Sequence, residues 1–217
     1  MPVKRKFGPR YKVPFRRRRE GKTDYRARYR MLLSQRIRAV VRKSRRNIII
    51  QFVKAELKGD KTLSTTRSLE LRKFGWNFSG GNIPAAYLTG YLAGLKALKA
   101  GINEAILDIG PQRSTRGGRL YAALKGMIDA GLDIPYSENV LPSLNRIQGQ
   151  HIASYAEKLM NEDIELYNKR FSRYIRDGLD PTNIVSVFMT VLSNIAKEFN
   201  VESPSFEEES EEGFEEE

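Results

Sequence analysis

Three short runs of apolar and β-branched residues, separated by turn signals, follow the charged start of the chain. They are RIRAVVRKS, NIIIQFVKAEL and KTLSTTRSLEL, at residues 36–44, 47–57 and 61–71. Together they are rich in Val, Ile and Thr, which favour strands. Turn residues lie between them at 44–47 and at Gly59-Asp60. The pattern therefore predicts a three-strand meander.

A nearly continuous apolar run follows at residues 83–101, between the helix start signal Asn82 and the stop signal Gly101. It predicts a long helix. Three more elements are predicted after it: a buried strand in NEAILDIG, a helix in RLYAALKGMIDAG and a short strand in LDIP, at residues 103–110, 119–131 and 132–135. This order predicts an α/β domain with a mixed sheet of about five strands covered by helices. The helical crossover makes the last two strands parallel.

From about Ser137 the pattern becomes amphipathic. Apolar residues at helical spacing predict two helices, one with Ile164, Tyr167, Phe171, Tyr174 and Ile175, the other with Ile184, Phe188, Val191, Ile195 and Phe199. The end of the chain is dominated by Glu and predicts a disordered acidic tail.

The first 22 residues have too few aliphatic residues for a core and carry Gly or Pro at five positions. They predict an extended basic arm that orders only on a partner. Thr23 is a candidate N-cap for a short helix with Tyr25, Tyr29, Leu32 and Leu33 on one side. We therefore divide the chain into the arm, an α/β RNA-binding domain, a C-terminal helical extension and the acidic tail, at residues 1–22, 23–136, 137–200 and 201–217.

Positive charge is concentrated near the N-terminus. Residues 1–46 hold 19 Lys and Arg against two acidic residues, a net charge of +17, whereas the whole chain carries +12. Such a surface favours nucleic acid, because each cation placed on a phosphate releases condensed counterions. Arginine predominates, and its planar group binds phosphate oxygens in pairs and stacks on bases. Aromatic rings among these cations favour RNA with unpaired regions.

Three segments are candidates for RNA contact: the arm with the helix after it, the tip of the first predicted hairpin, and the loop GPQRSTRGGR. This loop lies between a strand end and a helix start, where backbone N–H groups commonly meet anions. The candidate residues are Lys4, Arg5, Lys6, Arg10, Tyr11, Lys12, Phe15, Arg16, Arg17, Arg18, Arg19, Lys22, Thr23, Tyr25, Arg26, Arg28, Tyr29, Arg30, Arg42, Lys43, Arg45, Arg46, Arg113, Arg116 and Arg119.

Alternatives remain for several of these features. The loop lacks the Walker pattern G-x-x-x-x-G-K-[ST], which excludes that route to nucleotide hydrolysis, and its glycines also fit a simple turn. Phe74, Trp76 and Phe78 fit either a core or base stacking. The charge run also fits a nuclear address, a transit peptide or a DNA-compacting protein. Asp108, at the end of a buried strand, fits a metal-dependent RNA-processing enzyme, although no second or third carboxylate accompanies it.

The composition excludes other classes of site. The chain has no cysteine, which excludes disulfides and thiolate metal sites, and His151 alone cannot form a histidine cluster. We expect no metal or other cofactor. No apolar run approaches the roughly 20 residues of a membrane span, and no secretion signal is present. We therefore expect a cytoplasmic protein without a membrane partner.

Four motifs, in this order, closely resemble the large-subunit ribosomal protein eighteen family in its archaeal and eukaryotic form. They are FGPRYKVPFRRRREGKTDYRARYRMLL, YLTGYLAGLKALKAG, EAILDIG and MIDAGLDIPYSENVLP. The resemblance covers residues 5–160 and is less distinctive in the helical extension. The acidic tail has no counterpart in the family pattern.

The resemblance implies a ribonuclease H-like mixed sheet without nuclease activity, in a structural protein that binds 5S rRNA in the central protuberance. It also implies that the arm runs between 5S and large-subunit rRNA, beside the ribosomal protein five family. Carried over by motif, the RNA-contacting segment of the arm contains Arg10, Tyr11, Lys12, Phe15 to Arg19, Lys22, Thr23, Tyr25, Arg26, Tyr29 and Arg30. No small-molecule substrate is implied.

Overall fold

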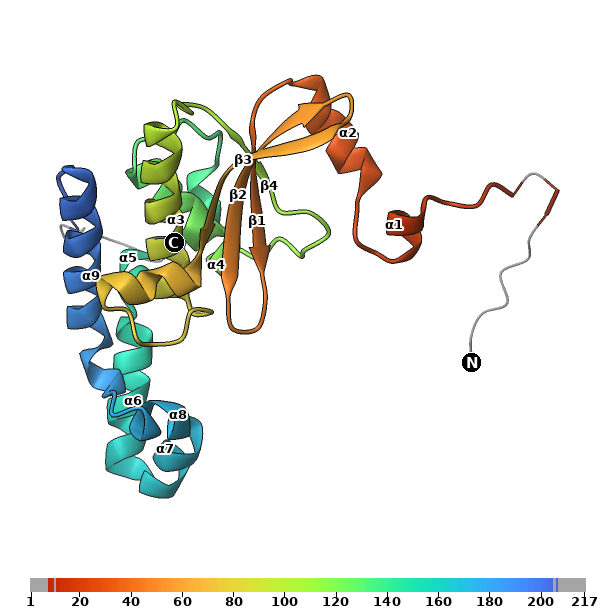
Figure 1. The fold of residues 1–217 in the computed structure, drawn as a ribbon. Helices are drawn as coiled ribbons and strands as arrows, with labels where there is room; N and C mark the ends of the chain where they lie inside the picture. The colour runs from red at the N-terminus through yellow and green to blue at the C-terminus, as the bar shows by residue number, and fades with distance from the viewer. Residues whose placement is uncertain (1–7, 10, 205, 207–217) are drawn as a thin grey trace, which may run out of the picture.

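A mixed β-sheet lies at the centre of the computed structural model, which describes residues 8, 9, 11–204 and 206 (Figure 1). The N-terminal half contains α1 (Arg16–Arg19), α2 (Tyr25–Leu33), β1 (Arg38–Lys43), β2 (Ile48–Glu56), β3 (Gly59–Arg67), the 3-10 helix η1 (Ser68–Phe74) and α3 (Ile83–Lys99). The C-terminal half contains β4 (Ile106–Asp108), α4 (Arg119–Asp129), η2 (Glu138–Val140), α5 (Leu144–Gln148), α6 (Gln150–Glu162), α7 (Ile164–Arg170), α8 (Ser172–Arg176), η3 (Pro181–Asn183) and α9 (Ile184–Phe199).

The sheet has the strand order β3-β2-β1-β4 within the described residues. Strands β1, β2 and β3 form the predicted antiparallel meander, and β4 pairs parallel to β1. The α/β class and the mixed sheet are confirmed, but the prediction of about five strands is one too many. Residues 132–135 make a single parallel bridge, from Asp133 to Glu104. Pro135 has no N–H with which to extend that ladder.

The third strand also ends earlier than predicted. Residues 68–71 belong to η1, where the Arg67 N–H donates to Glu70 Oε1 at 2.9 Å. Leu71 and Phe74 thereby turn into the core, where both are buried. A local cap and two buried side chains thus override the strand pattern.

Helices α3 and α4 cover one face of the sheet (Figure 1). Buried residues of the strands alternate with more exposed ones, as a half-buried sheet requires. The two helices approach closely at Gly90 and Gly126: a Cβ on Gly90 would lie 2.1 Å from the Ala123 carbonyl oxygen, and one on Gly126 would lie 2.2 Å from that of Tyr87. Both positions therefore require glycine.

The aromatic stretch between η1 and α3 belongs to the core. Phe74, Trp76 and Phe78 are 8%, 1% and 6% exposed, so none offers a face to a base. Of the two interpretations left by the sequence, core packing is confirmed.

The C-terminal lobe, α6 to α8, projects from the body (Figure 1). Helices α5 and α6 were not predicted, and the first predicted amphipathic helix is two short helices that meet at Phe171. Phe171 is buried with Ala156 and Leu159 in a small core of the lobe itself. The second predicted helix is α9, which packs on α3.

No helix within the described residues is both long enough and apolar enough to cross a membrane.

Candidate nucleic-acid interface

Polar side chains line the sheet face opposite α3 and α4. Side chains alternate along a strand, so Arg38, Val40 and Arg42 of β1 share this face, while the residues between them are buried in the core. Asp108 of β4 pairs with Val40 in the parallel register. Its carboxylate therefore lies between the two guanidinium groups.

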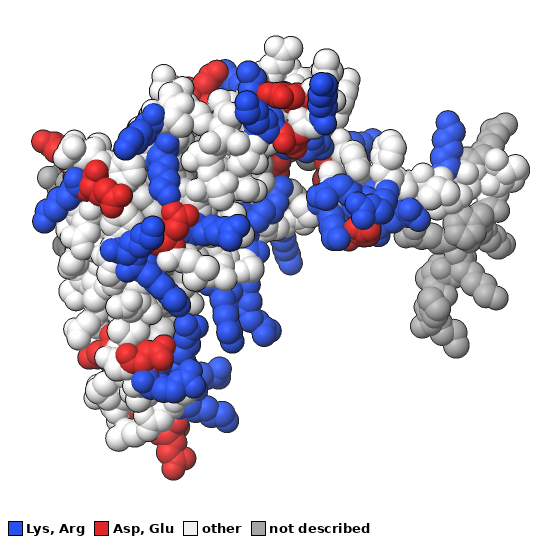
Figure 2. Space-filling model, viewed as in Figure 1, with Lys and Arg blue, Asp and Glu red and all other residues white. Residues whose placement is uncertain are grey.

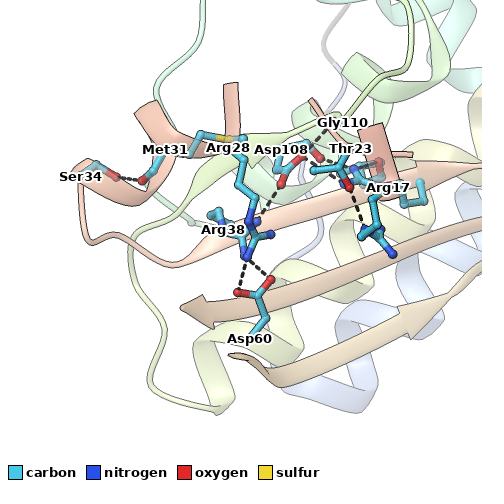
Figure 3. A network of polar contacts seen from close by, with 11 residues as sticks. Arg17, Thr23, Arg28, Met31, Ser34, Arg38, Asp60, Asp108 and Gly110 are labelled. Carbon is cyan, nitrogen blue, oxygen red and sulfur yellow. Dashed lines mark hydrogen bonds and ion pairs between the residues drawn. The ribbon is translucent and has the colours of Figure 1, made fainter. Parts of the chain in front are cut away.

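Asp108 is 4% exposed and accepts hydrogen bonds on both carboxylate oxygens. Arg38 Nη1 donates to Oδ2 at 3.0 Å (Figure 3). Arg42 Nη2 donates to Oδ1 at 3.1 Å. The Gly110 N–H also donates to Oδ1 at 2.8 Å. The described residues contain no group of three His, Cys, Asp or Glu that could hold a metal. The carboxylate that we considered as a metal ligand is thus engaged by two arginines.

The network continues to α2 through Asp60, at the end of the β2–β3 hairpin. Arg38 Nη2 donates to Asp60 Oδ2 at 2.7 Å, and Arg28 Nη2 donates to Oδ1 at 2.8 Å. Burial by itself would raise the pKa of Asp60, but hydrogen bonds from Arg28 and Arg38 outweigh it and lower the pKa. The bond to Asp60 raises the pKa of Arg28. The network therefore anchors α2 on the sheet.

The start of α2 differs from the prediction. Asp24, not Thr23, is the N-cap: its Oδ1 accepts from the N–H groups of Arg26 at 2.9 Å and Ala27 at 3.2 Å. Thr23 Oγ1 accepts instead from Arg17 Nε at 2.8 Å. A side chain that the sequence suggests as a cap thus ties the arm to the helix.

Part of the predicted extended arm is a helical turn, α1, where no element was predicted. Phe15, just before it, packs against Tyr25 of α2 with ring centroids 5.1 Å apart. Phe15 remains 71% exposed, so this contact leaves most of its ring free for a base. A groove of about 610 Å³ lies between α1–α2 and the open sheet face, with Arg17, Arg38 and Asp108 in its lining.

Many of the predicted contact residues are exposed cations, and they gather over α1 and at the end of the β1–β2 hairpin (Figure 2). Within the described part of the chain, ten predicted contact cations, nine exposed and Lys43 half-buried, make no side-chain hydrogen bond or ion pair, which leaves their charge available. They are Lys12, Arg18, Arg19, Arg26, Arg30, Lys43, Arg45, Arg46, Arg113 and Arg116.

Other predicted contact residues are held by partners within the fold. Arg16 and Lys22 pair with Glu20, at 3.7 and 2.9 Å. Arg119 Nη1 donates to the carbonyl oxygens of Ser44 at 3.1 Å and Gly81 at 2.7 Å. Arg119 thus braces the hairpin tip against the loop before α3, and its role as an RNA contact stays a prediction.

The loop before α4 has little free backbone for an anion. The Gly117 N–H donates to the Val140 carbonyl at 3.0 Å, and that of Gly118 to Thr115 at 3.1 Å. Gly117 has a φ of +62°, which explains the glycine as a turn residue. The side chains of Arg113 and Arg116, which are exposed, are what this loop offers a phosphate.

Sequence reasoning missed Arg38 and Asp60, which hold the interface together. The alternation of side chains along a strand places Arg38 and Arg42 on one face of the sheet. It does not show which acidic residues pair with them. Tyr11 and Tyr29 are exposed beside the free cations. Lys4, Arg5, Lys6 and Arg10 lie outside the described residues.

Comparison with known proteins gives two concordant findings. The chain matches the model of a family described as "Ribosomal large subunit proteins 60S L5, and 50S L18" over residues 9–104 and 99–137. It is 54% identical to large ribosomal subunit protein uL18 of Korarchaeum cryptofilum, over 86% of this chain and 95% of the relative.

Two further relatives carry the same name. The protein of Aeropyrum pernix is 50% identical over 82% of this chain and 83% of its own length. That of Methanothermobacter thermautotrophicus is 49% identical over 88% of this chain and 98% of its own length. The similarity thus extends beyond the sheet into the C-terminal helices.

Proposed function

The chain belongs to the family of ribosomal large subunit proteins 60S L5 and 50S L18, and we propose that it binds 5S rRNA and attaches it to large-subunit rRNA in the central protuberance. It is a protein of the cytoplasmic large ribosomal subunit and not an enzyme. Its work is charge neutralisation, which lets two polyanionic RNAs approach, together with recognition of folded RNA.

The observation that supports this proposal is the division of the arginines into two sets. Arg28, Arg38 and Arg42 are paired with Asp60 and Asp108, and the link from Arg28 through Asp60 to Arg38 holds α2 on the sheet. Arg18 and Arg19 of α1, Arg26 and Arg30 of α2, and Arg45 and Arg46 of the hairpin tip are exposed and have no acidic partner among the described residues. The first set serves the fold, and the second remains for phosphates.

We assign the arm, residues 1–22, to the junction between 5S and large-subunit rRNA, next to the ribosomal protein five family. The body at 23–136 sets the direction in which the arm leaves, since Arg17 and Phe15 contact the start of α2. The extension at 137–200 and the tail at 201–217 complete this division of the chain.

Salt titration of 5S rRNA binding tests the charge mechanism. If about eight phosphates are neutralised, the logarithm of the association constant falls with the logarithm of salt concentration at a slope of about −6 to −7. Filter binding or fluorescence anisotropy from 50 to 400 mM potassium chloride measures it. A slope shallower than about −2 contradicts binding by charge neutralisation.

Removal of residues 1–22 tests the arm. This variant loses most affinity for 5S rRNA, because six exposed arginines and lysines of its described part are gone: Lys12, Arg16, Arg17, Arg18, Arg19 and Lys22. Its thermal unfolding stays cooperative, since none of these residues is buried. Unchanged RNA affinity, measured at equal salt, would mean that the arm does not contribute to RNA binding.

A further inference from the structure

The C-terminal lobe is fixed against the loop that precedes α3. Tyr174 of α8 accepts a hydrogen bond on Oη from the Ser79 N–H at 3.3 Å. Its ring meets Phe78 edge-on, with centroids 5.3 Å apart. Helix α8 is therefore held in place by both a polar and an aromatic contact.

The same loop supports the tip of the β1–β2 hairpin. A Cβ on Gly81 would lie 2.6 Å from the Arg45 carbonyl oxygen, and one on Gly80 would lie 3.1 Å from that of Arg46. The backbone of the tip thus rests directly on these glycines. Since residues 78–81 touch the hairpin on one side and α8 on the other, the tip and the lobe are neighbours.

The lobe carries cations toward this junction. Figure 2 shows basic side chains on the side of the lobe nearest the end of the β1–β2 hairpin. The exposed cations of α7 and α8 are Lys169, Arg170, Arg173 and Arg176. Within the described residues Lys169 and Arg170 have no acidic partner, and Arg173 and Arg176 reach only Asp177, at 3.5 and 3.9 Å and in solvent. Exposed pairs of this kind contribute little, so a phosphate can replace the carboxylate.

We propose that the α7–α8 cations and the hairpin tip form one RNA-binding surface, the tip–lobe surface, which grips the phosphate backbone of 5S rRNA. This inference rests on the proposed function and extends it to the C-terminal helices. The rings on α7 and α8 are packed within the fold, since Tyr167 lies against Phe171 and Tyr174 lies edge-on against Phe78. The surface therefore binds phosphates independently of base sequence.

The double variant Arg170→Gln/Arg173→Gln in the full chain tests the tip–lobe surface. The matched control is Lys99→Gln/Lys197→Gln, which removes the same charge from exposed positions. Lys99 ends the 17-residue α3, about 25 Å along the helix from the loop at its start. Lys99 lies over the Phe199 ring at the end of α9, so both control positions are at that far end.

Each lost phosphate contact weakens binding about fivefold at 0.15 M salt and makes the salt slope shallower by about 0.9. We expect the double variant to bind 5S rRNA about thirtyfold more weakly than the unaltered chain, with a slope shallower by nearly two. The control keeps the original affinity and slope. If both variants bind alike, the surface binds something other than this RNA, such as an acidic protein, and the inference is overturned while the proposed function stands. If the unaltered chain does not bind 5S rRNA, the proposed function itself fails.

A tethered cleavage reagent gives a second readout that does not depend on affinity. The chain has no cysteine, so Ser172→Cys, at the exposed start of α8, provides a single attachment site for an iron chelate that generates hydroxyl radicals. The complex with 5S rRNA should be cut near this position. A chelate at Glu198→Cys, on α9, should give no cut. Intact RNA with both reagents would overturn the inference.

Discussion

At the scale of single residues, Asp108 shows why a carboxylate at a strand end need not be a catalytic group. It is buried, and its charge is balanced by Arg38 and Arg42 on the neighbouring strand. Loss of the carboxylate charge removes the partner of Arg42 and one of the two partners of Arg38, which keeps its bond to Asp60. Asp108→Asn should therefore lower the free energy of unfolding by about 1.5–3 kcal/mol, as for a lost hydrogen bond to a charged group.

Urea denaturation measures this change. Asp177→Asn, at an exposed pair of α8, serves as control and should stay within about 0.5 kcal/mol of the original. Equal stabilities of the two variants would mean that the Asp108 pairs contribute nothing to the fold.

Asp60 gives a pH dependence with a definite sign. Its pKa is lowered in the folded protein from the ordinary 3.8, so the folded state favours the charged form. Its contribution is fully present above pH 3.8 and is lost as pH falls through the lower folded value. Asp60→Asn should therefore be less stable than the original protein at pH 6. The difference in their free energies of unfolding should shrink as the solution is acidified.

Unfolding curves of both proteins between pH 6 and pH 2 supply the measurement. If the difference in the free energy of unfolding stays constant through this range, the lower stability of Asp60→Asn comes from something other than the carboxylate charge.

At the scale of elements, the pairing of α3 with α4 depends on two glycines. By helix propensity alone, Gly90→Ala should stabilise α3 by about 1 kcal/mol. The new Cβ would lie 2.1 Å from the Ala123 carbonyl oxygen, a backbone atom that cannot rotate away. The clash dominates, so we expect a net loss of at least about 2 kcal/mol in the free energy of unfolding.

Denaturant unfolding of Gly90→Ala checks this sign directly. Ser154→Ala, at an exposed position of α6, is the control for a helix substitution without a clash. A stabilised Gly90→Ala protein would mean that the two helices can move apart at little cost.

At the scale of the whole molecule, the chain after α9 returns to the body. Phe206 packs against Tyr87 of α3 and Phe188 of α9, with centroids 5.7 and 5.8 Å apart. Tyr91 Oη donates to the Glu202 carbonyl at 3.4 Å. The segment predicted as a disordered tail therefore begins with an anchored stretch, and residues 207–217 lie outside the described part.

We expect Phe206→Ala to lower the free energy of unfolding by about 1–3 kcal/mol, less than for a fully buried ring because Phe206 is only partly buried. Ending the chain after Phe206 should change it by less than about 0.5 kcal/mol. Calorimetry of both proteins distinguishes the anchor from the acidic residues beyond it.

The meander, the long helix α3 and the cationic segment at residues 1–46 could all be predicted from the sequence. Strand and helix periods involve neighbours two to four positions apart, and a net charge of +17 in 46 residues is a property of composition. The sequence by itself therefore determined the fold class and the need for a polyanionic partner.

Only the tertiary structure decided which arginines are free. Arg38 and Asp108 are 70 positions apart, and no local pattern pairs them until β1 and β4 lie side by side. The same holds for Tyr174, 95 positions from Ser79, which brings the lobe to the hairpin tip. Whether a guanidinium braces the fold or meets RNA depends on acids and carbonyls that the chain brings near it from far away, and folding alone supplies those neighbours.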